Sequence, residues 1–461
     1  MFKRDSPVLA HILTFFFFFA VILIFSILRL PFRFLFILIL AAIVFLIAFI
    51  NTNFALIILI FSMLLSPEIP IFKVPDRAVV VRIDDILLIV IFFSWLAKTA
   101  LNKGFGFLKN TPVNKPLLIY AVLCIIVTAL AIILGIGQAK FSNAFFYILK
   151  YLEYFVIFFL VNNNIKDLKQ IKAFTILMLI VCFIIVLYGY WQMRTGAYRL
   201  SAPFEGEKPE PNTLAGYLIL MFGIMGGLLL HSPSLRLKLI LGGLFLFTIP
   251  VFLLTLSRGG YIAFIAMYFC FIIFSRKARW FLITVFFVFA LILPKILPSS
   301  VIERVNKTFH PDITVGEQRY EIGGRSFAVE QSAAARLEVL KWVIPMWLKS
   351  PLFGYGVTGV GFVEGQYTRT LAELGILGIL AFFWVIFRLF INFLRIYRSS
   401  EDDWVEGICL GLIASLIAFL VHATGANIFI IVRIMEPFWF LTAMVLAVPY
   451  INRNMSAADI G

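Results

Sequence analysis

The sequence has little charge for its length. Asp, Glu, Lys and Arg make up 14% of its 461 residues, whereas 62% are hydrophobic. Soluble domains are about half apolar and about one quarter charged, so this excess of apolar surface excludes a water-soluble globule. Residues 8–28 contain no Asp, Glu, Lys or Arg, and about 20 such residues cross the roughly 30 Å of hydrocarbon in a bilayer. The composition therefore predicts a chain whose main partner is the lipid bilayer.

Cysteine and histidine are also scarce, with four residues of each. The cysteines lie far apart inside apolar segments, without the spacing of metal ligands: Cys124, Cys182, Cys270 and Cys409. We interpret them as small core residues rather than a disulfide set. No zinc, dinucleotide or nucleotide-loop motif is present. We therefore expect neither a metal nor another cofactor.

Acidic residues are outnumbered, 24 against 39 Lys and Arg, which gives a net charge of +15. The basic residues gather in short loops such as 98–115 and 162–172. In such loops they indicate the cytoplasmic side of a membrane rather than a nucleic-acid partner. Both termini are then cytoplasmic, and the chain belongs in the cell inner (cytoplasmic) membrane. The loops expected on the outer side are 66–82, 135–142, 194–211 and 298–368.

Fourteen apolar segments follow one another along the chain. They predict an all-α, polytopic transmembrane helix bundle of 12–14 spans. Lys3 and Arg4 precede the first long run, and no small-residue cleavage site follows it, so a first spanning helix is expected rather than a signal peptide. Residues 34–66 allow one span or two. The predicted parts are an N-terminal transmembrane bundle (1–297), a large extracytoplasmic loop (298–368) and C-terminal transmembrane helices (369–461).

The loop 298–368 is the one long polar segment, with seven Lys or Arg and seven Asp or Glu. Loops beyond about 15 residues are usually functional or disordered. Within it, Ser332–Leu348 has the spacing of an amphipathic helix, with Leu337, Leu340 and Ile344 on one face. We expect this helix to lie on or near the outer leaflet.

Two outer-side arginines lie in short motifs beside apolar runs. Arg199 begins RLSAPF, which is followed by PNTLAG from Pro211, and Arg258 lies in TLSRGG. Each allows a plain interpretation, an interfacial Arg in a turn that reaches toward lipid headgroups. Charges at membrane depth are nevertheless costly and usually functional.

A third place combines Arg336 of the amphipathic helix with Pro351–Gly356 and Glu364. Glycine-rich turns can bring backbone amides to an anion. Glu364 is either a general base or a solvated loop acid. Several guanidinium groups near the outer leaflet suit a diphosphate, because Arg binds phosphate with two parallel hydrogen bonds and stays charged. A lipid-linked sugar diphosphate presents that group at this depth.

The order of these motifs resembles the O-antigen ligase and O-antigen polymerase superfamily of membrane glycosyltransferases. The resemblance is specific over about 199–380 and generic elsewhere; it rests on RLSAPFEG, PNTLAGYL, TLSRGGYIAF, AARLEVLKWVIPMWLKSPLFGYG and QYTRTLAELGILGILAFF. It implies transfer of a whole glycan from a polyprenyl-diphosphate-linked donor to a glycan or lipid-linked glycan acceptor, without a metal. It also implies that Arg199 and Arg258 bind the diphosphate, with Arg336 assisting.

One position departs from the family pattern. Ligases of the superfamily carry a His nine residues before the Glu of a Glu-x-Gly motif; here that Glu is Glu373, and counting back gives Glu364. A carboxylate can still accept the proton of an acceptor hydroxyl. The resemblance therefore favours a polymerase over a lipid A core ligase. The alternative is a lipid-linked glycan flippase or polysaccharide exporter, which should place its functional charges near the bilayer midplane.

Overall fold

The computed structural model describes residues 32–74, 77–101, 108–205, 210–275, 278–309, 318–322, 325–329 and 331–458. The expected first span, 8–28, lies outside the described residues. Apolar runs form helices because a backbone in lipid must satisfy its own hydrogen bonds. Eight of these helices are long and apolar enough to cross a membrane: α5 (Asn114–Ile133), α6 (Phe141–Asn164), α7 (Leu168–Arg194), α8 (Pro211–His231), α9 (Leu235–Leu253), α14 (Gln366–Ser399), α15 (Asp403–His422) and α16 (Val432–Ala458).

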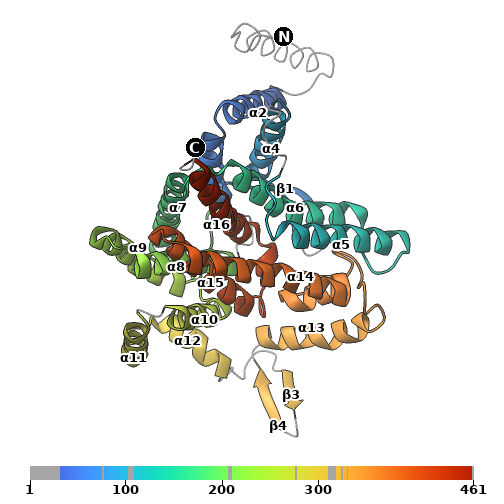
Figure 1. The fold of residues 1–461 in the computed structure, drawn as a ribbon. Coiled ribbons are helices and arrows are strands. Elements are labelled where there is room, and N and C mark those ends of the chain that lie inside the picture. The colour runs from blue at the N-terminus through green and yellow to red at the C-terminus, as the bar shows by residue number, and fades with distance from the viewer. Residues whose placement is uncertain are drawn as a thin grey trace. The chain divides into compact units, whose positions relative to one another are not determined.

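Five further apolar helices are described. Their bounds are Phe32–Ile50 for α2, Thr52–Leu65 for α3, Ile83–Leu101 for α4, Arg258–Phe274 for α10 and Arg279–Ile296 for α11. The segment 34–66 thus forms two helices that meet at Asn51, whose side-chain oxygen accepts from the amide of Asn53 at 3.1 Å. The predicted polytopic helix bundle is confirmed (Figure 1).

Two antiparallel hairpins and a 3-10 turn add to the helices. The first hairpin pairs β1 (Glu68–Val74) with β2 (Arg77–Arg82), and the second pairs β3 (Gln318–Ile322) with β4 (Arg325–Val329). The turn η1 spans Ile428–Ile430. Both hairpins occupy loops that were expected on the outer side, where the all-α prediction had placed no strand.

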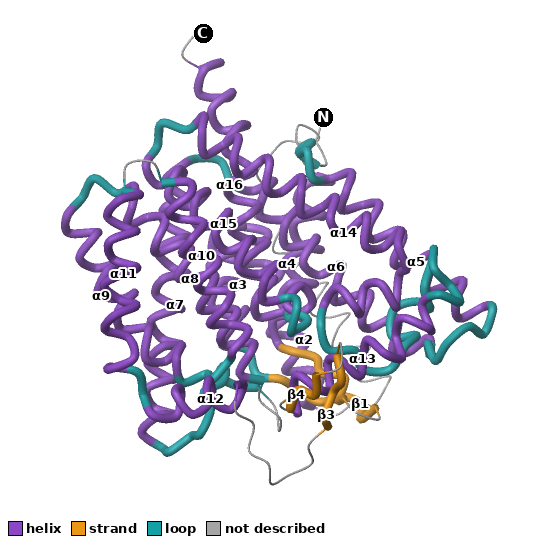
Figure 2. The backbone as a smooth tube through the Cα atoms, turned by 90° about the horizontal axis from the view of Figure 1, so that it is seen from below, coloured by secondary structure: helices purple, strands orange, loops and turns teal. Residues whose placement is uncertain are grey.

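The large loop contains two helices, α12 (Ser299–Phe309) and α13 (Gln331–Trp347). Helix α13 confirms the predicted helix at Ser332–Leu348, whereas α12 was not anticipated. Figure 2 shows α12, α13 and β1 at one end of the bundle and the C-terminal end of α16 at the other. The loop elements thus gather at a common end.

The chain divides into two compact units, residues 1–56 with 86–105, and residues 57–85 with 106–461. In the first unit, Ser94 Oγ donates to the carbonyl of Phe45 at 2.9 Å, and Lys98 Nζ donates to Thr52 Oγ1 at 3.2 Å. These bonds join α4 to α2 and to the start of α3. All the candidate functional residues lie in the second unit.

Helices α8 and α15 form the centre of the second unit, where their backbones touch. A Cβ added to Gly227 would lie 2.1 Å from the carbonyl oxygen of Gly407, and one added to Gly411 would lie 2.6 Å from that of Gly223. Both helices therefore carry a Gly-x-x-x-Gly pair at the contact, the pattern that lets helices approach closely in membranes.

Candidate functional site

The motif at Arg199 packs along the turn that precedes α10. The amide of Leu200 donates to the carbonyl of Leu254 at 3.0 Å. The guanidinium of Arg199 donates from Nε to the carbonyl of Thr255 at 3.2 Å and from Nη2 to that of Leu256 at 3.4 Å. Leu256 has a φ of 52°, a left-handed conformation that costs energy for a branched residue. The turn is therefore fixed by its contacts with Arg199.

Arg258 is the first residue of α10. Ser257 caps the helix by accepting from the amide of Gly260 at 3.2 Å, and its hydroxyl donates to Asn212 Oδ1 at 2.7 Å. Asn212 lies in the first turn of α8, which Pro211 begins because proline suits that position. The structure thus brings all three short motifs together. A helix N-terminus with an Arg on it favours an anion.

A third arginine joins Arg199 and Arg258 here. Arg304 of α12 lies close enough to Arg199 for their charges to interact. Burial, together with the charges of Arg304 and Arg258, lowers the pKa of the Arg199 guanidinium, which stays protonated because arginine begins above about 12. We refer to Arg199, Arg258 and Arg304 as the arginine cluster. Sequence reasoning missed Arg304, although α12 has a strongly amphipathic sequence, SSVIERVNKTF.

The far end of the RLSAPF motif is attached to α16. Arg433 Nη2 donates to the carbonyl of Phe204 at 3.2 Å and to Glu68 Oε1 at 3.3 Å. Glu205 follows Phe204, and burial raises the pKa of its carboxyl to about 7 against the opposing effect of Arg433. This outer-loop carboxyl therefore changes its charge near neutral pH.

Glu364 is half-buried in an extended segment just before α14. Three hydrogen bonds hold this segment on residues at and beyond the end of α15: Gln366 N to the carbonyl of Ala423 (3.0 Å), Asn427 Nδ2 to that of Val363 (2.9 Å) and Tyr367 Oη to that of Leu420 (2.6 Å). Gly365 has a φ of 100°, and a Cβ there would lie 3.2 Å from the carbonyl oxygen of Thr424. The position of Glu364 is therefore well defined.

His422, the last residue of α15, contacts the turn that carries Arg258. A Cβ added to Gly259 would lie 2.9 Å from its Cδ2 and 3.4 Å from its Nε2. The imidazole is 1% exposed. The end of α15 thus touches the start of α10 on one side and the Glu364 segment on the other. His422 was not among the predicted site residues, although a His inside an apolar segment is a usable signal.

The glycine-rich turn Pro351–Gly356 does not present its amides to an anion. The amides of Gly354, Tyr355 and Gly356 donate to the carbonyls of Ser350, Ala372 and Glu373 at 3.0, 3.0 and 2.8 Å. This corrects the anion-binding interpretation of the turn. It holds the start of α14 instead, where Gly375 (φ 64°, ψ −163°) kinks the helix and a Cβ would lie 2.3 Å from the carbonyl oxygen of Leu352.

Glu373 has a structural place in this arrangement. Its Oε1 accepts from Arg369 Nε at 3.0 Å and from the amide of Thr358 at 3.0 Å. The side chains of Arg369 and Glu373 are 7% and 3% exposed. Arg369 and Glu373 thus form a buried, charge-balanced pair within α14, and the bond from the Thr358 amide ties this helix to the segment that follows the glycine-rich turn.

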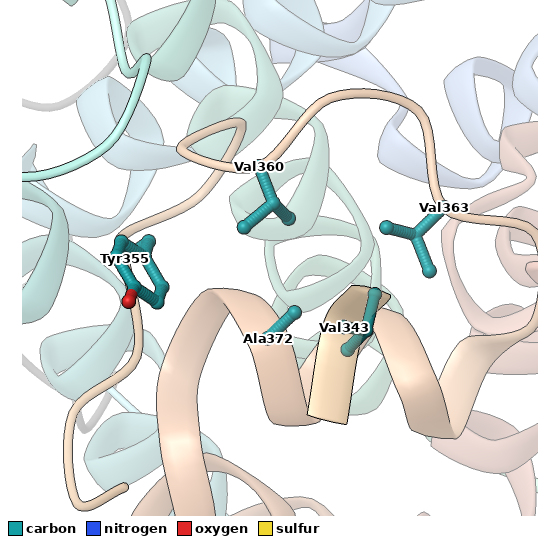
Figure 3. Packing of buried hydrophobic residues seen from close by; sticks show 5 residues of the cluster. All are labelled: Val343, Tyr355, Val360, Val363 and Ala372. Carbon is teal, nitrogen blue, oxygen red and sulfur yellow. The ribbon is translucent and has the colours of Figure 1, made fainter. Parts of the chain in front are cut away.

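Helix α13 packs on the same region through apolar side chains. Figure 3 shows Val343 of α13 facing Ala372 of α14, with Tyr355, Val360 and Val363 around them. The face expected to be apolar is turned outward, since Leu340 and Ile344 are 38% and 44% exposed. Arg336 belongs to α13, but its side chain lies outside the described residues. Its predicted role stays a prediction.

Fold and site together define a multi-pass membrane protein with an arginine cluster at the end of the bundle that holds the loop elements. Residues 242–383 match the family model described as O-antigen ligase. The match supports the O-antigen ligase and polymerase superfamily and confirms the predicted resemblance. It indicates a glycosyltransferase-like enzyme of polysaccharide biosynthesis. Arg258, Arg304, Arg336 and Glu364 lie inside the matched region and Arg199 precedes it. No curated protein matches the chain.

Proposed function

We propose that the protein transfers a glycan en bloc from a polyprenyl-diphosphate donor to an acceptor glycan on the outer face of the cytoplasmic membrane. The observation that carries this proposal is the convergence of Arg199, Arg258 and Arg304. Guanidinium groups that converge in a partly buried site create a positive potential that attracts an anion. A diphosphate supplies the charge and the oxygens that guanidinium groups bind best.

The proposed reaction is a single displacement at the anomeric carbon of the donor. The acceptor hydroxyl attacks that carbon, a new glycosidic bond forms, and the bond to the diphosphate oxygen breaks. The arginine cluster stabilises the negative charge that grows on the leaving diphosphate. Glu364 takes the proton of the acceptor hydroxyl. The anomeric configuration is inverted, and no metal is needed because the arginines supply the positive charge.

The acceptor class follows from the residue at the base position. A carboxylate stands where ligases of the superfamily carry a His, which favours a polymerase acting on a second lipid-linked glycan. The basic loops at 98–115 and 162–172 support an orientation in which the arginine cluster faces outward. In that orientation the cluster meets a donor whose glycan has already reached the outer leaflet.

The test is a transfer assay with the purified full-length protein and a polyprenyl-diphosphate oligosaccharide, without added metal. We expect the wild type to lengthen the glycan and Arg258→Ala to lose at least about 100-fold in rate, the typical cost of removing one such donor. Arg236→Ala is the matched control, because Arg236 is an exposed arginine at the start of α9. Full activity of Arg258→Ala, or movement of intact donor across liposomes without transfer, would overturn the proposal; the second result would indicate a flippase.

A further inference from the structure

A second cluster of charges lies in the same unit and has the opposite sign. Its members come from the end of β2, the first turn of α4, and helices α6 and α16. They are Arg82, Asp84, Asp85, Lys150, Glu153 and Glu436. We refer to these six residues as the acidic cluster. None of them belongs to the arginine cluster or to the Glu364 segment.

The two basic residues of the acidic cluster are fully engaged. Arg82 contacts Asp84, to which its Nε donates at 2.9 Å, and its Nη2 lies 2.8 Å from Glu436 Oε2. Lys150 Nζ lies 2.6 Å from Asp85 Oδ2 and 3.2 Å from Glu153 Oε2. Each basic side chain thus serves two carboxylates at once.

The charges do not balance. Four carboxyl groups face two basic side chains, so full ionisation leaves two negative charges without a counter-charge among the described members of the cluster. The nearby Arg433 is occupied by Glu68 and by the carbonyls of Leu64, Ser66 and Phe204. Uncompensated charge inside a membrane protein is costly, because the surroundings cannot solvate it. A double negative excess therefore calls for two positive charges.

Unused oxygens identify where those charges belong. Asp85 Oδ1, Glu153 Oε1 and Glu436 Oε1 are buried and have no hydrogen-bond partner. The Glu436 side chain is fully buried and lies close enough to Asp85 for their charges to interact. This acid comes from a different helix; its Oε2 pairs with Arg82, and its Oε1 is the oxygen left without a partner. Buried carboxylate oxygens are normally satisfied, so these need a partner.

The spacing of the oxygens fits a metal ion. One oxygen from each of Asp84, Asp85 and Glu153 lies within 4.8 Å of the others. Calcium takes oxygen ligands at about 2.3–2.6 Å, so two ligands on opposite sides of it are up to about 5 Å apart. Magnesium would require a tighter octahedron, with ligands at about 2.0–2.1 Å.

We propose that the acidic cluster binds one calcium ion through Asp84, Asp85 and Glu153, with Glu436 beside them. A divalent ion supplies the two missing positive charges while Arg82 and Lys150 keep their ion pairs. The ion joins the β2–α4 junction to α6 and α16. This site is separate from the chemistry proposed above, and its role is to stabilise the bundle.

The first measurement is the metal content of the full-length protein, purified in detergent with calcium chloride and then desalted. We expect about one calcium per chain, and removal by EGTA should lower the melting temperature by about 5 °C, reversibly on adding calcium back. Glu153→Gln should lower calcium affinity at least about tenfold. Glu401→Gln, an exposed carboxyl outside the cluster, should bind calcium like the wild type.

A double variant guards against simple misfolding. Glu153→Gln with Glu436→Gln leaves the pairs Arg82–Asp84 and Lys150–Asp85, so the cluster becomes neutral. We expect this variant to fold, to contain no calcium and to have a melting temperature that EGTA does not change.

Two results would overturn the calcium proposal. One is a wild type that contains no calcium, ignores EGTA and gains stability on acidification, because two protons would then neutralise the cluster. The other is unchanged calcium binding by Glu153→Gln. Both results are independent of the proposed transfer reaction. Arg258→Ala should keep its calcium although it loses transfer. A wild type that contains no calcium but still transfers glycan would refute only the calcium site.

Discussion

The arginine cluster and the acidic cluster differ in the sign of their charge, but each brings like charges from several elements close together. In the first, three basic side chains converge; in the second, four carboxylates share two basic side chains. The buried pair Arg369–Glu373 is a useful reference, because its charges cancel and Glu373 also accepts the amide of Thr358 from another segment. A balanced pair holds the fold together by itself. In the acidic cluster the carboxylates outnumber the described basic side chains, which indicates a positive partner that is not part of the chain.

Replacing Glu364 tests whether chemistry takes place beside the arginine cluster. Glu364→Gln removes the proposed base but keeps the shape of the side chain, so the transfer rate should fall by about 10²- to 10⁴-fold. The measurement is the rate of glycan extension at saturating donor. Glu364→His restores a proton acceptor and should recover part of the rate, while Glu338→Gln on α13 serves as control. A fully active Glu364→Gln would show that Glu364 is not the base of the reaction.

Breaking the balanced pair should affect folding rather than binding. Glu373→Ala leaves Arg369 buried without its partner and removes the acceptor for the amide of Thr358. Breaking a buried pair in this way costs about 3–5 kcal/mol of unfolding free energy. Thermal unfolding in detergent measures the loss. Glu373→Gln keeps an acceptor for Thr358 and should lose less; equal stability of the wild type and Glu373→Ala would contradict the structural role.

Arg304 sharpens the comparison, because only the structure adds it to the arginine cluster. Arg304→Ala should weaken donor binding about tenfold, equivalent to about 1.4 kcal/mol. The effect should appear in KM for the donor with little change in kcat. Lys349→Ala, an exposed basic residue beyond α13, is the control. A change in kcat alone, at constant KM, would argue against a binding role.

A last effect, at Glu205, depends on pH. Its pKa is raised to about 7 by burial, whereas an unfolded glutamate titrates near about 4.3. The folded state therefore binds the proton more tightly, so this stabilisation is full at low pH and is lost as the pH rises toward 7. Partial exposure limits the effect to about 1–2 kcal/mol. The melting temperature of Glu205→Gln should therefore stay constant between pH 5 and 7.5, whereas that of the wild type should fall. Melting temperatures of the wild type and the variant that fall in parallel would contradict this.

The bundle followed readily from the sequence, because lipid leaves few options for an apolar run. The helix at α13 and the meeting of RLSAPF, PNT and TLSRGG at one end also agreed with expectation. The two hairpins were not predicted. In β1, Pro70 and the irregular register between Pro70 and Phe72 interrupt the alternation of side chains with a period of two that marks a strand. Leu340 and Ile344, on the face of α13 expected to meet the outer leaflet, are exposed, and Val343 supplies the buried contact with the protein.

The charged clusters could be predicted only in part. Arg199 and Arg258 were found because each begins or interrupts a recognisable motif. Arg304 looked like an ordinary loop residue, since its proximity to Arg199 is a long-range contact. Glu153 and Glu436 lay inside apolar segments, where a lone acid is a signal. What the sequence could not supply was that α6 and α16 bring these two acids to the same place as Asp84 and Asp85.

The glycine contact between α8 and α15 restricts how the protein can move. With backbone against backbone at Gly223–Gly411 and Gly227–Gly407, neither helix can slide or turn without a steric clash. Asn212 at the start of α8 and His422 at the end of α15 are therefore held at a fixed separation. We expect the space for two bulky glycans to come instead from displacement of α12 and α13. Donor binding and product release would then depend on movement of these loop helices, while α8 and α15 keep their relative position.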